Sequence, residues 1–310
     1  MRVIDLHCDT ITRCLDENKP LFENDFHLSL QRAGKMERFI ECFAIWQRDE
    51  YRNLDAVHYF QRYLMRYLRE MAQNADIITK IEYADDLENL NTPFGAILTV
   101  EGGSAIGGEI ANLDFLFDYG VRIMTLTWNG DNEISGGIGN NNLGLTDFGI
   151  SVVEKMNRLG MIIDVSHLSE QGFYDVAQFS KKPFIATHSN LRKVCNHKRN
   201  LTDEQFDIIK NRGGIVGLNF ADIFLADDKY SADIDSVYRM TYAFMERGGE
   251  KTLAIGSDFD GADMPKGILG VQSLYDVYNY LLQKNLSENL LNDIFYNNPY
   301  NFLLNNLPRR

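Results

Sequence analysis

Long apolar runs are missing from this sequence of 310 residues. No window approaches the ~18 apolar residues that a membrane-spanning helix needs, which argues against an integral membrane protein. The first residues also lack the basic and apolar pattern of a secretory signal peptide. We therefore expect a cytoplasmic protein without a membrane partner.

Cysteine and basic residues are scarce as well. The four cysteines are scattered and form no CxxC pair, so a disulfide scaffold is not expected and free thiols suit a reducing compartment. Lys and Arg number 31 against 44 Asp and Glu, which gives a net charge of −13. Because a surface of that sign repels nucleic acid and anionic membranes, neither is expected as the main partner.

The sequence does contain a regular alternation of apolar runs and helical patterns. Near-continuous apolar runs are typical of buried parallel strands. The eight runs lie at about 3–6, 39–46, 94–100, 122–127, 161–165, 183–187, 214–219 and 252–256. The helical patterns lie at about 52–75, 111–118, 147–159, 169–179, 202–211, 233–247, 272–284 and 287–296. Eight such units predict a (β/α)8 TIM barrel as one domain over residues 1–310, with a doubly wound open sheet as the alternative.

Polar side chains that can bind metals follow five of these runs. In a barrel the carboxyl ends of the strands meet at one rim, so these side chains are expected to converge there. Three histidines and three carboxylates are too many for one tetrahedral zinc and suit two divalent ions with a carboxylate between them. In chain order they are His7, Asp9, Glu101, His167, His188 and Asp258.

Each of these residues also has a purely structural interpretation. Glu101 fits an exposed acid in a turn, and His167 and His188 fit the start of a helix. Asp258 opens a segment that resembles part of a calcium loop but lacks the later ligands. Five strand ends that all carry a metal-competent residue favour the shared site. The other histidines lie on predicted helices or loops and are left out; they are His27, His58 and His197.

Six motifs carry the candidate residues. They are DLHCDT at 5–10, TVEGG at 99–103, MIIDVSHLS at 161–169, PFIATHSN at 183–190, RNLTDEQ at 199–205 and IGSDFDG at 255–261. They resemble the membrane (renal-type) dipeptidase family, zinc dipeptidases of the amidohydrolase superfamily. The motifs follow the family order across nearly the whole chain, and the spacing from His188 to Arg199 is kept. The resemblance implies a (β/α)8 barrel and a metallopeptidase.

The resemblance also implies a set of metal ligands. His7 and Asp9 would bind one zinc ion, and His167 and His188 would bind the second. Glu101 would bridge the two ions and so belongs to the catalytic residues as well. The implied cofactor is two Zn²⁺ per chain.

The remaining roles concern the substrate. Asp258 would handle protons on a hydroxide held between the two metals, within reach of the substrate. Arg199 would pair with the carboxylate of the substrate, a task that suits a planar guanidinium. The implied activity is hydrolysis of the peptide bond of small dipeptides. Relatives are often dimers, so a homodimer is implied by analogy.

One position departs from the family pattern. Where mammalian members carry a histidine after the fourth strand, this chain has Trp128, followed by Asn129 and a loop over 129–144 rich in glycine and asparagine. Indole has one donor and does not exchange protons near neutral pH, so Trp128 is expected to form a wall for the substrate or to pack. Another donor of the loop would then serve the substrate, and Asn129 is a candidate.

Two alternatives for the function stay open. One is a different metal hydrolase of the same kind acting on another small amide or ester, such as an N-acyl amino acid deacylase, a lactonase or a phosphotriesterase-like enzyme. The other is a barrel that binds metal without catalysis. A complete ligand set with a candidate base disfavours the second, because structural metal sites are usually closed and mononuclear.

Overall fold

Parallel β-strands form the centre of the computed structural model, which describes residues 1–228 and 230–310. The strands hydrogen-bond in the order β6-β5-β4-β2-β1-β8-β7, with β3 beside the first half of β4, and every pair is parallel. The result is a half-barrel sheet in an α/β fold. The bounds are β1 Arg2–Cys8, β2 Arg38–Trp46, β3 Ile78–Lys80, β4 Phe94–Glu101, β5 Val121–Thr125, β6 Ile162–Asp164, β7 Val216–Leu218 and β8 Leu253–Ile255.

The expected sixth strand, at 183–187, is not a regular strand. The segment makes only isolated parallel bridges, from Ile185 to Asp164 at the end of β6 and from Ala186 to Val216 in β7. A side chain interrupts the ladder, since Thr187 N–H donates to the Asp164 carboxylate at 2.9 Å instead of to a neighbouring carbonyl. The closed (β/α)8 arrangement is therefore present in part. The short strand β3 was not predicted.

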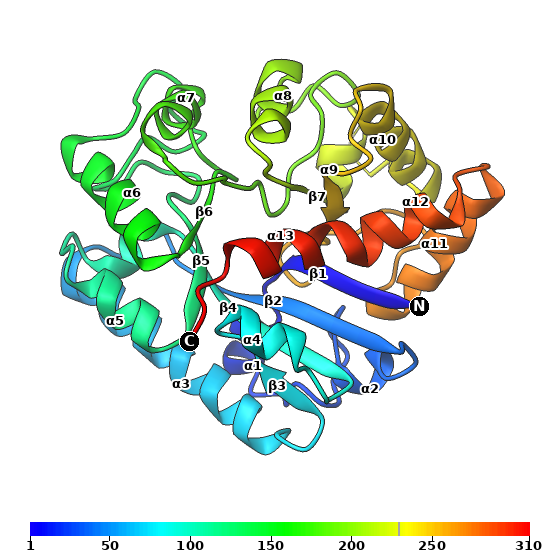
Figure 1. Ribbon diagram of the computed structural model, residues 1–310, viewed down its shortest axis with the longest axis horizontal. Coiled ribbons are helices and arrows are strands. Elements are labelled where there is room, and N and C mark those ends of the chain that lie inside the picture. The colour runs from blue at the N-terminus through cyan, green and yellow to red at the C-terminus, as the bar shows by residue number, and fades with distance from the viewer. Residues whose placement is uncertain (229) are drawn as a thin grey trace.

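Helices surround the sheet (Figure 1). The long ones agree with the predicted patterns to within a few residues. They are α3 Asn53–Gln73, α5 Asn112–Asp118, α6 Asp147–Leu159, α7 Glu170–Phe179, α8 Asp203–Asn211, α10 Ile234–Glu246 and α11 Leu274–Gln283. Shorter elements complete the set: α1 Thr10–Asp16, α2 Leu30–Ala33, α4 Ala84–Glu88, η1 Gly103–Ile106, α9 Asp222–Leu225, η2 Val271–Ser273, α12 Glu288–Asn292 and η3 Asp293–Asn297.

Local hydrogen bonds explain where these helices begin. Thr146 Oγ1 accepts from Gly149 N–H at 2.9 Å at the start of α6, and Ser169 Oγ accepts from Gly172 N–H at 2.8 Å at the start of α7. At α8 the Thr202 and Gln205 side chains each bond to the other's backbone N–H. Such caps satisfy N–H groups that the helix itself leaves free.

The last helix, α13 Asn298–Asn306, was not predicted and covers one end of the sheet. Figure 1 shows it crossing in front of β1. Its Phe302 and Leu303 belong to an apolar cluster with Ile4 and Leu6 of β1 and Ile40 of β2. Burying such side chains stabilises the fold by about 25 cal/mol per Å². The apolar cluster at this end of the sheet therefore contributes to the stability of the fold.

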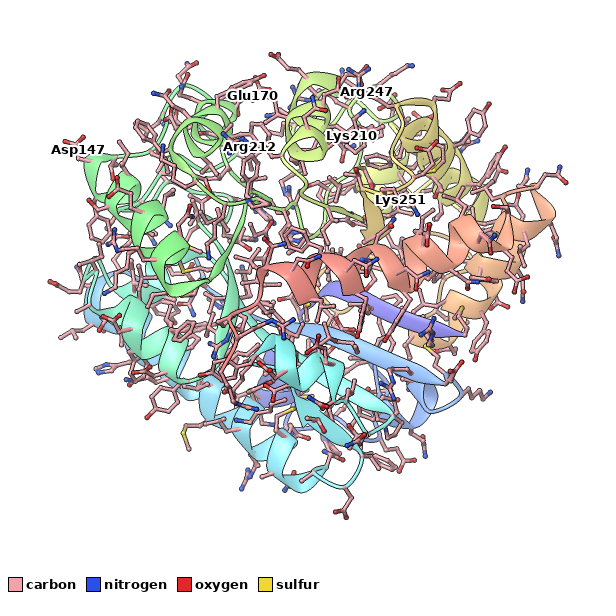
Figure 2. The ribbon with its side chains drawn as sticks, in the orientation of Figure 1. Asp147, Glu170, Lys210, Arg212, Arg247 and Lys251 are labelled. Carbon is pink, nitrogen blue, oxygen red and sulfur yellow. The ribbon has the colours of Figure 1, made fainter. Side chains whose placement is uncertain are left out.

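Charged side chains lie on the outer helices (Figure 2). Arg247, after α10, pairs with Asp203 and Asp207 of α8 at 2.9 and 2.6 Å, and Lys210 Nζ donates to the Arg247 carbonyl. Partly exposed pairs of this kind contribute about 0–1 kcal/mol each. The four cysteines are buried free thiols. Within 1–228 and 230–310, none of the helices is long and apolar enough to cross a bilayer.

Candidate active site

The six predicted ligand-type residues come together at the carboxyl ends of the strands. His7 lies in β1 and Glu101 ends β4. The other four follow strands or the bridging segment and are Asp9, His167, His188 and Asp258. All six are buried, with at most 8% of their surface exposed. The predicted convergence is thus present in the structure.

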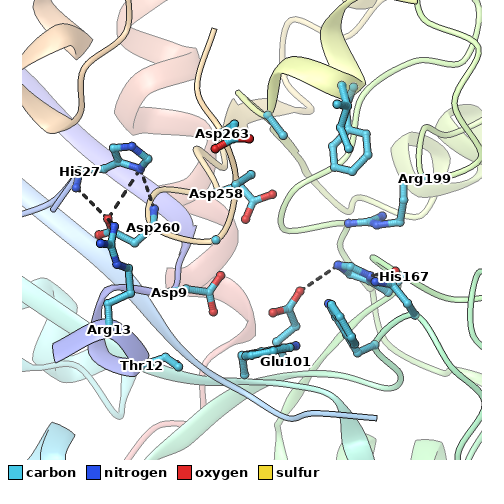
Figure 3. Close-up of a pocket in the computed structure, with 18 of the residues that line it drawn as sticks. Asp9, Thr12, Arg13, His27, Glu101, His167, Arg199, Asp258, Asp260 and Asp263 are labelled. Carbon is cyan, nitrogen blue, oxygen red and sulfur yellow. Dashed lines mark hydrogen bonds and ion pairs between the residues drawn. The ribbon is translucent and has the colours of Figure 1, made fainter. Parts of the chain in front are cut away.

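Glu101 is at the centre of this cluster. Its Oε1 lies 2.8 Å from His167 Nε2 and 3.4 Å from His188 Nε2. Its Oε2 lies 3.8 Å from His7 Nε2. Figure 3 shows the carboxylate between His167 and the side of the cavity that carries Asp9 and Asp258. The two oxygens of one carboxylate therefore face two different groups of ligand atoms.

Several nitrogen and oxygen atoms of the cluster lie close enough to share a cation. His7 Nε2 is 3.5 Å from Asp9 Oδ2, and His167 Nε2 is 3.0 Å from His188 Nε2. Two groups have ligand atoms within 4.8 Å of one another: His7, Glu101 and His188, and His7, Asp9 and Asp258. His7 Nε2 and Asp9 Oδ1 are buried without a hydrogen-bond partner among the described residues. Buried polar atoms of this kind normally have a partner.

The protonation states follow from burial and from mutual charge. Burial alone would lower the pKa of His7, but the Glu101, Asp9 and Asp258 carboxylates outweigh it and raise the pKa to about 10. Burial, then Arg199 and His7, hold the pKa of His167 well below its usual range; burial and His7 do the same for His188. Metals bind the neutral imidazole. His167 and His188 are already in that form, whereas a cation at this cluster would have to displace the proton of His7.

Burial also raises the pKa of both acids that face the cluster. For Glu101 the pKa rises well above its usual range through burial and the nearby Asp9 carboxylate. For Asp258 burial is the largest cause, partly offset by His7. A group of carboxylates that resists ionisation in this way is favourable for a cation, which would remove the repulsion.

The far ring nitrogens of two histidines are held by polar side chains, of which Thr187 and its partner Asp164 were not predicted as site residues. His188 Nδ1 lies 2.8 Å from Thr187 Oγ1, which donates to Asp164 Oδ2 at 2.6 Å. His167 Nδ1 lies 3.0 Å from Asn129 Oδ1. Partners of this kind fix the ring and the tautomer of a metal-binding histidine. The sequence does contain a signal for this contact: Asp164 is an acidic residue within an apolar run, and a buried carboxylate needs polar partners.

Asp258 is positioned by a second missed residue and by a glycine. Asn219 Nδ2 donates to Asp258 Oδ2 at 3.0 Å. A Cβ atom on Gly261 would come within 2.1 Å of Asp9 Oδ2 and 2.5 Å of Asp258 Oδ1. Only glycine therefore leaves room for both carboxylates to face each other, which accounts for the last residue of the IGSDFDG motif.

Backbone conformations at the site are unusual. His167, Asp258 and Asp260 have φ of 69°, 62° and 70°. Residues with a side chain adopt this left-handed region only at a cost, typically about 1–3 kcal/mol, and often at functional sites. His167 and Asp258 each lie three residues after the end of a strand, β6 and β8. The left-handed backbone there changes the direction of the chain and directs their side chains across the rim.

A cavity of about 700 Å³ opens above the cluster. Its size lies in the ~300–1,000 Å³ range of small-molecule sites. The predicted substrate residues Arg199, Trp128 and Asn129 all line it, and Trp128 packs edge-on against Trp46 at 4.9 Å between ring centroids. Asn129 lines the cavity and also contacts His167, a role that was not expected.

Arg199 is a buried guanidinium with few partners. Only 6% of its surface is exposed, and its one side-chain hydrogen bond within the described residues runs from Nη2 to the His188 carbonyl at 3.4 Å. Burial lowers its pKa below the usual range. Figure 3 shows the side chain on the same side of the cavity as His167. A buried charge normally pairs with an opposite charge, so this end of the cavity suits an anion.

His27, which the sequence analysis left out, also lines the cavity. The His27 ring nitrogen Nδ1 accepts a hydrogen bond from the backbone N–H of Asp260 at 3.0 Å. The backbone N–H of His27 donates to Asp260 Oδ1 at 2.7 Å. Asp260 further accepts from Arg13 (Figure 3) and from the Thr10 hydroxyl. Long-range contacts of this kind leave no periodic signal in a sequence. His27 thus shapes the wall opposite Arg199.

Histidines and carboxylates gathered at the carboxyl ends of a parallel sheet define a class of protein, the metal-dependent hydrolases. Residues 1–303 match the model of the membrane dipeptidase family, peptidase family M19. The chain belongs to this family, as the motifs predicted.

Individual relatives agree with this assignment. An uncharacterised protein from the region 5′ of pqqA in Klebsiella pneumoniae is 34% identical over 209 residues, which are 64% of this chain and 77% of that protein. An uncharacterised dipeptidase of Schizosaccharomyces pombe is 30% identical over 247 residues, 72% of this chain and 58% of that protein. The chain thus spans little more than half of this yeast relative.

A solved structure has nearly the same fold over the whole chain. It is a metallopeptidase from Rhodobacter sphaeroides, liganded with a phosphinate mimic of the dipeptide L-Ala-D-Ala. Its TM-score is 0.91 at 28% identity, and the match covers 99% of each chain.

Proposed function

We propose that this protein is a zinc-dependent dipeptidase with two zinc ions in its site. The observation that carries the proposal is the position of Glu101, whose two oxygens face His167 and His188 on one side and His7 on the other. A metallopeptidase of the same fold binds a dipeptide mimic, which supports the substrate class.

The residues fit two divalent ions. Zinc bonds of about 2.0–2.1 Å in a tetrahedron place ligand atoms about 3.3 Å apart. The spacings of 2.8, 3.0 and 3.4 Å among Glu101, His167 and His188 are close to that value. On the other side, His7 Nε2 and Asp9 Oδ1 have no hydrogen-bond partner within 1–228 and 230–310, as expected for atoms that bind a metal. Imidazole mixed with carboxylate suits zinc.

Asp258 is the proposed proton carrier. When bound, the two ions would lower the pKa of a water from ~15.7 towards about 7 and would polarise the scissile carbonyl. Asp258 accepts a proton from that water and returns it to the leaving amine. Asn219 keeps the Asp258 carboxylate oriented toward Asp9 and the cavity.

Arg199 is the proposed binding site for the carboxylate of the substrate. Its guanidinium is buried, lines the cavity and lacks an ion pair among the described residues. A carboxylate held there, with the peptide bond at the metal cluster, limits the substrate to short peptides. The two parallel donors of a guanidinium match the two carboxylate oxygens.

Trp128 and Asn129 are proposed to form the remaining wall around the substrate. The indole of Trp128 packs on Trp46 and lies 6.3 Å from the His167 ring between centroids. This apolar surface, at the position where the family pattern has a histidine, favours one second candidate: a related metal hydrolase acting on an N-acyl amino acid or a lactone.

Three further proposals follow from the sequence. The bridges through 183–187 support a closed (β/α)8 barrel, because that segment joins β6 to β7. The free thiols are consistent with a cytoplasmic location, and the homodimer rests on analogy with relatives.

Hydrolysis of a dipeptide panel by protein of counted metal content tests the proposal. The panel contains L-Xaa-L-Xaa and L-Xaa-D-Xaa dipeptides, N-acetylated controls, and a lactone. We expect two zinc ions per chain and cleavage of the free dipeptides. Two ions with cleavage of the N-acetylated compounds or the lactone alone would favour the second candidate, and fewer than two ions would contradict the two-metal site.

A further inference from the structure

A second, much smaller cavity lies behind Arg199. Its volume is about 10 Å³, and Ser189, Arg199 and Asn200 are among the residues that line it. Arg199 also lines the large cavity. The guanidinium of this residue therefore forms part of the wall between the two spaces.

Three buried polar atoms without a partner among the described residues belong to residues that line the small cavity. They are Ser189 Oγ, Arg199 Nε and Asn200 Oδ1. The three residues expose 2%, 6% and 1% of their surface, so bulk solvent does not supply the missing bonds. A buried polar group without a hydrogen bond is unfavourable, and three such groups on residues that line one space point to a shared ligand.

The hydrogen-bonding capacity of these atoms defines that ligand. The Arg199 Nε–H can only donate, and the Ser189 hydroxyl can donate or accept. Asn200 Oδ1 can only accept, and its identity as the oxygen is fixed because Asn200 Nδ2 donates to the Cys195 carbonyl at 2.9 Å and to the Phe224 carbonyl at 3.0 Å. The ligand must therefore both accept and donate.

Size and charge leave one small neutral molecule. A water needs about 10–15 Å³ of such space and two to four polar partners, which the cavity supplies. A chloride or another anion would be repelled by Asn200 Oδ1. The Arg192 guanidinium, which also borders the cavity, is already paired with Glu170 at 2.5 Å and so offers no free charge to an anion.

We propose that one buried water molecule bridges Ser189, Arg199 and Asn200, and that Ser189 and Asn200 are thereby positioning residues for the substrate-binding guanidinium. This inference rests on the proposed role of Arg199. The water would hold Nε while Nη2 donates to the His188 carbonyl, and these two bonds together fix the plane of the guanidinium beside the large cavity. A preorganised guanidinium loses less side-chain entropy when the carboxylate of the substrate binds.

A high-resolution crystal structure of the zinc-loaded protein tests the water directly. We expect one water within hydrogen-bond distance of the three atoms. A cavity without density would overturn the proposal, and so would a bromide signal at this place in crystals grown with bromide in place of chloride.

Two variants of Ser189 test the effect on the substrate. Ser189→Ala removes one partner and leaves the water two, whereas the larger side chain of Ser189→Val fills the water position. We expect KM for dipeptides to rise about fivefold in Ser189→Ala, the equivalent of about one hydrogen bond, and more in Ser189→Val. In both variants kcat and the bound zinc should stay near the parent values, and KM for a dipeptide amide, which lacks the carboxylate, should not change.

Ser135→Ala is the matched control, because Ser135 is also fully buried and its hydroxyl has no partner in the described part of the chain, but the residue lines neither cavity. Unchanged KM in Ser189→Ala, or equal effects in Ser135→Ala, would refute the positioning role. Arg199→Ala distinguishes a failure of this inference from a failure of the proposed function. If Arg199→Ala raises KM while Ser189→Ala does not, the proposed water is refuted and the role of Arg199 stands. If Ser189→Val does not fold, Ser189→Ala and the crystal structure still decide.

Discussion

Several side chains of the candidate site have conformations and surroundings that are unfavourable for folding, and Asp258 is the clearest case. It is buried, has a positive φ of 62° and faces a second carboxylate across Gly261. Such a residue persists only when the surrounding structure holds it. The Asn219 side chain and the backbone hydrogen bond to His7 hold Asp258 in this conformation. The unfavourable free energy is therefore confined to the candidate active site.

Replacing Asp258 by Asn should leave the metals and remove the proton carrier. We expect Asp258→Asn to retain two zinc ions and to lower kcat by about 100- to 10,000-fold, the usual range for a general acid–base group. Metal analysis and dipeptide kinetics measure this. Asp263→Asn, in the same cavity wall, is the control and should keep kcat. Near-normal turnover of Asp258→Asn would remove it from the mechanism.

Arg199→Ala should act on binding instead. We expect KM for dipeptides to rise strongly while KM for amides without a free carboxylate changes little, because the lost charge pair exists only with the carboxylate. Parallel kinetics on a dipeptide and its amide measure the difference. Equal changes for both substrates would contradict the assignment.

Glu41 gives a prediction at the residue scale that concerns stability. Its two oxygens are buried without a partner among the described residues, and burial together with Asp5 raises its pKa well above the usual range. The folded state therefore keeps a proton that the unfolded chain loses above about pH 4.3, so this residue lowers stability as pH rises. Glu41→Gln should remove the penalty and unfold at a higher temperature at pH 8, with a smaller gain at pH 4.5.

Thermal unfolding at both pH values measures this effect. Glu37→Gln, on an exposed residue of the same segment, is the control and should leave the melting temperature unchanged. A Glu41→Gln protein that gains nothing at pH 8 would show that the carboxylate has a partner in solution.

At the scale of elements, the strands and long helices could be predicted because their apolar patterns are local. His7, Glu101 and His167 could be predicted as candidate site residues because each closes or follows such a run. The short strand β3 and the helix α13 have weak patterns of their own. Asp164 and Asn219 were missed because their partners lie 23 and 39 residues away, where no spacing rule connects them.

The start of α8 gives a prediction at this scale. Thr202 and Gln205 cap one another's backbone directly after the segment that carries Arg199 and Asn200. We expect Thr202→Ala to lower the free energy of unfolding by about 1 kcal/mol, the usual value of such a cap. Urea unfolding measures it, with Ser151→Ala on the exposed face of α6 as the control. An unchanged urea midpoint would mean that tertiary contacts alone hold this helix end.

At the scale of the whole molecule, the metal cluster joins distant parts of the chain. Its carboxylates and histidines come from β1, β4 and the segments after β6 and β8. Repulsion among Asp9, Glu101 and Asp258 acts against folding when no cation is present. Metal binding should therefore stabilise the fold, since a ligand that binds only the native state shifts unfolding toward higher temperature.

Removing the metals with a chelator should lower the melting temperature, and added zinc should restore it. Differential scanning calorimetry with metal analysis measures both. His58→Gln, a change on the exposed face of α3 remote from the cluster, should respond to the chelator like the parent. A melting temperature that stays constant while the zinc is lost would contradict the coupling of metal and fold.

The pairing of β1 with β8 has a consequence for how the chain is made. Asp5 and Ile255 are register partners, and Asp258 N–H donates to the His7 carbonyl. A ribosome that adds about 5–20 residues per second produces His7 and Asp9 roughly 10 to 50 s before Asp258. During that interval the earliest strand has no neighbour on one side, and the cluster lacks its last member. The nascent chain therefore exposes one unpaired edge of β1 until β8 has been synthesised. We expect chaperones to bind this strand during that interval, because unpaired strand edges are prone to aggregation.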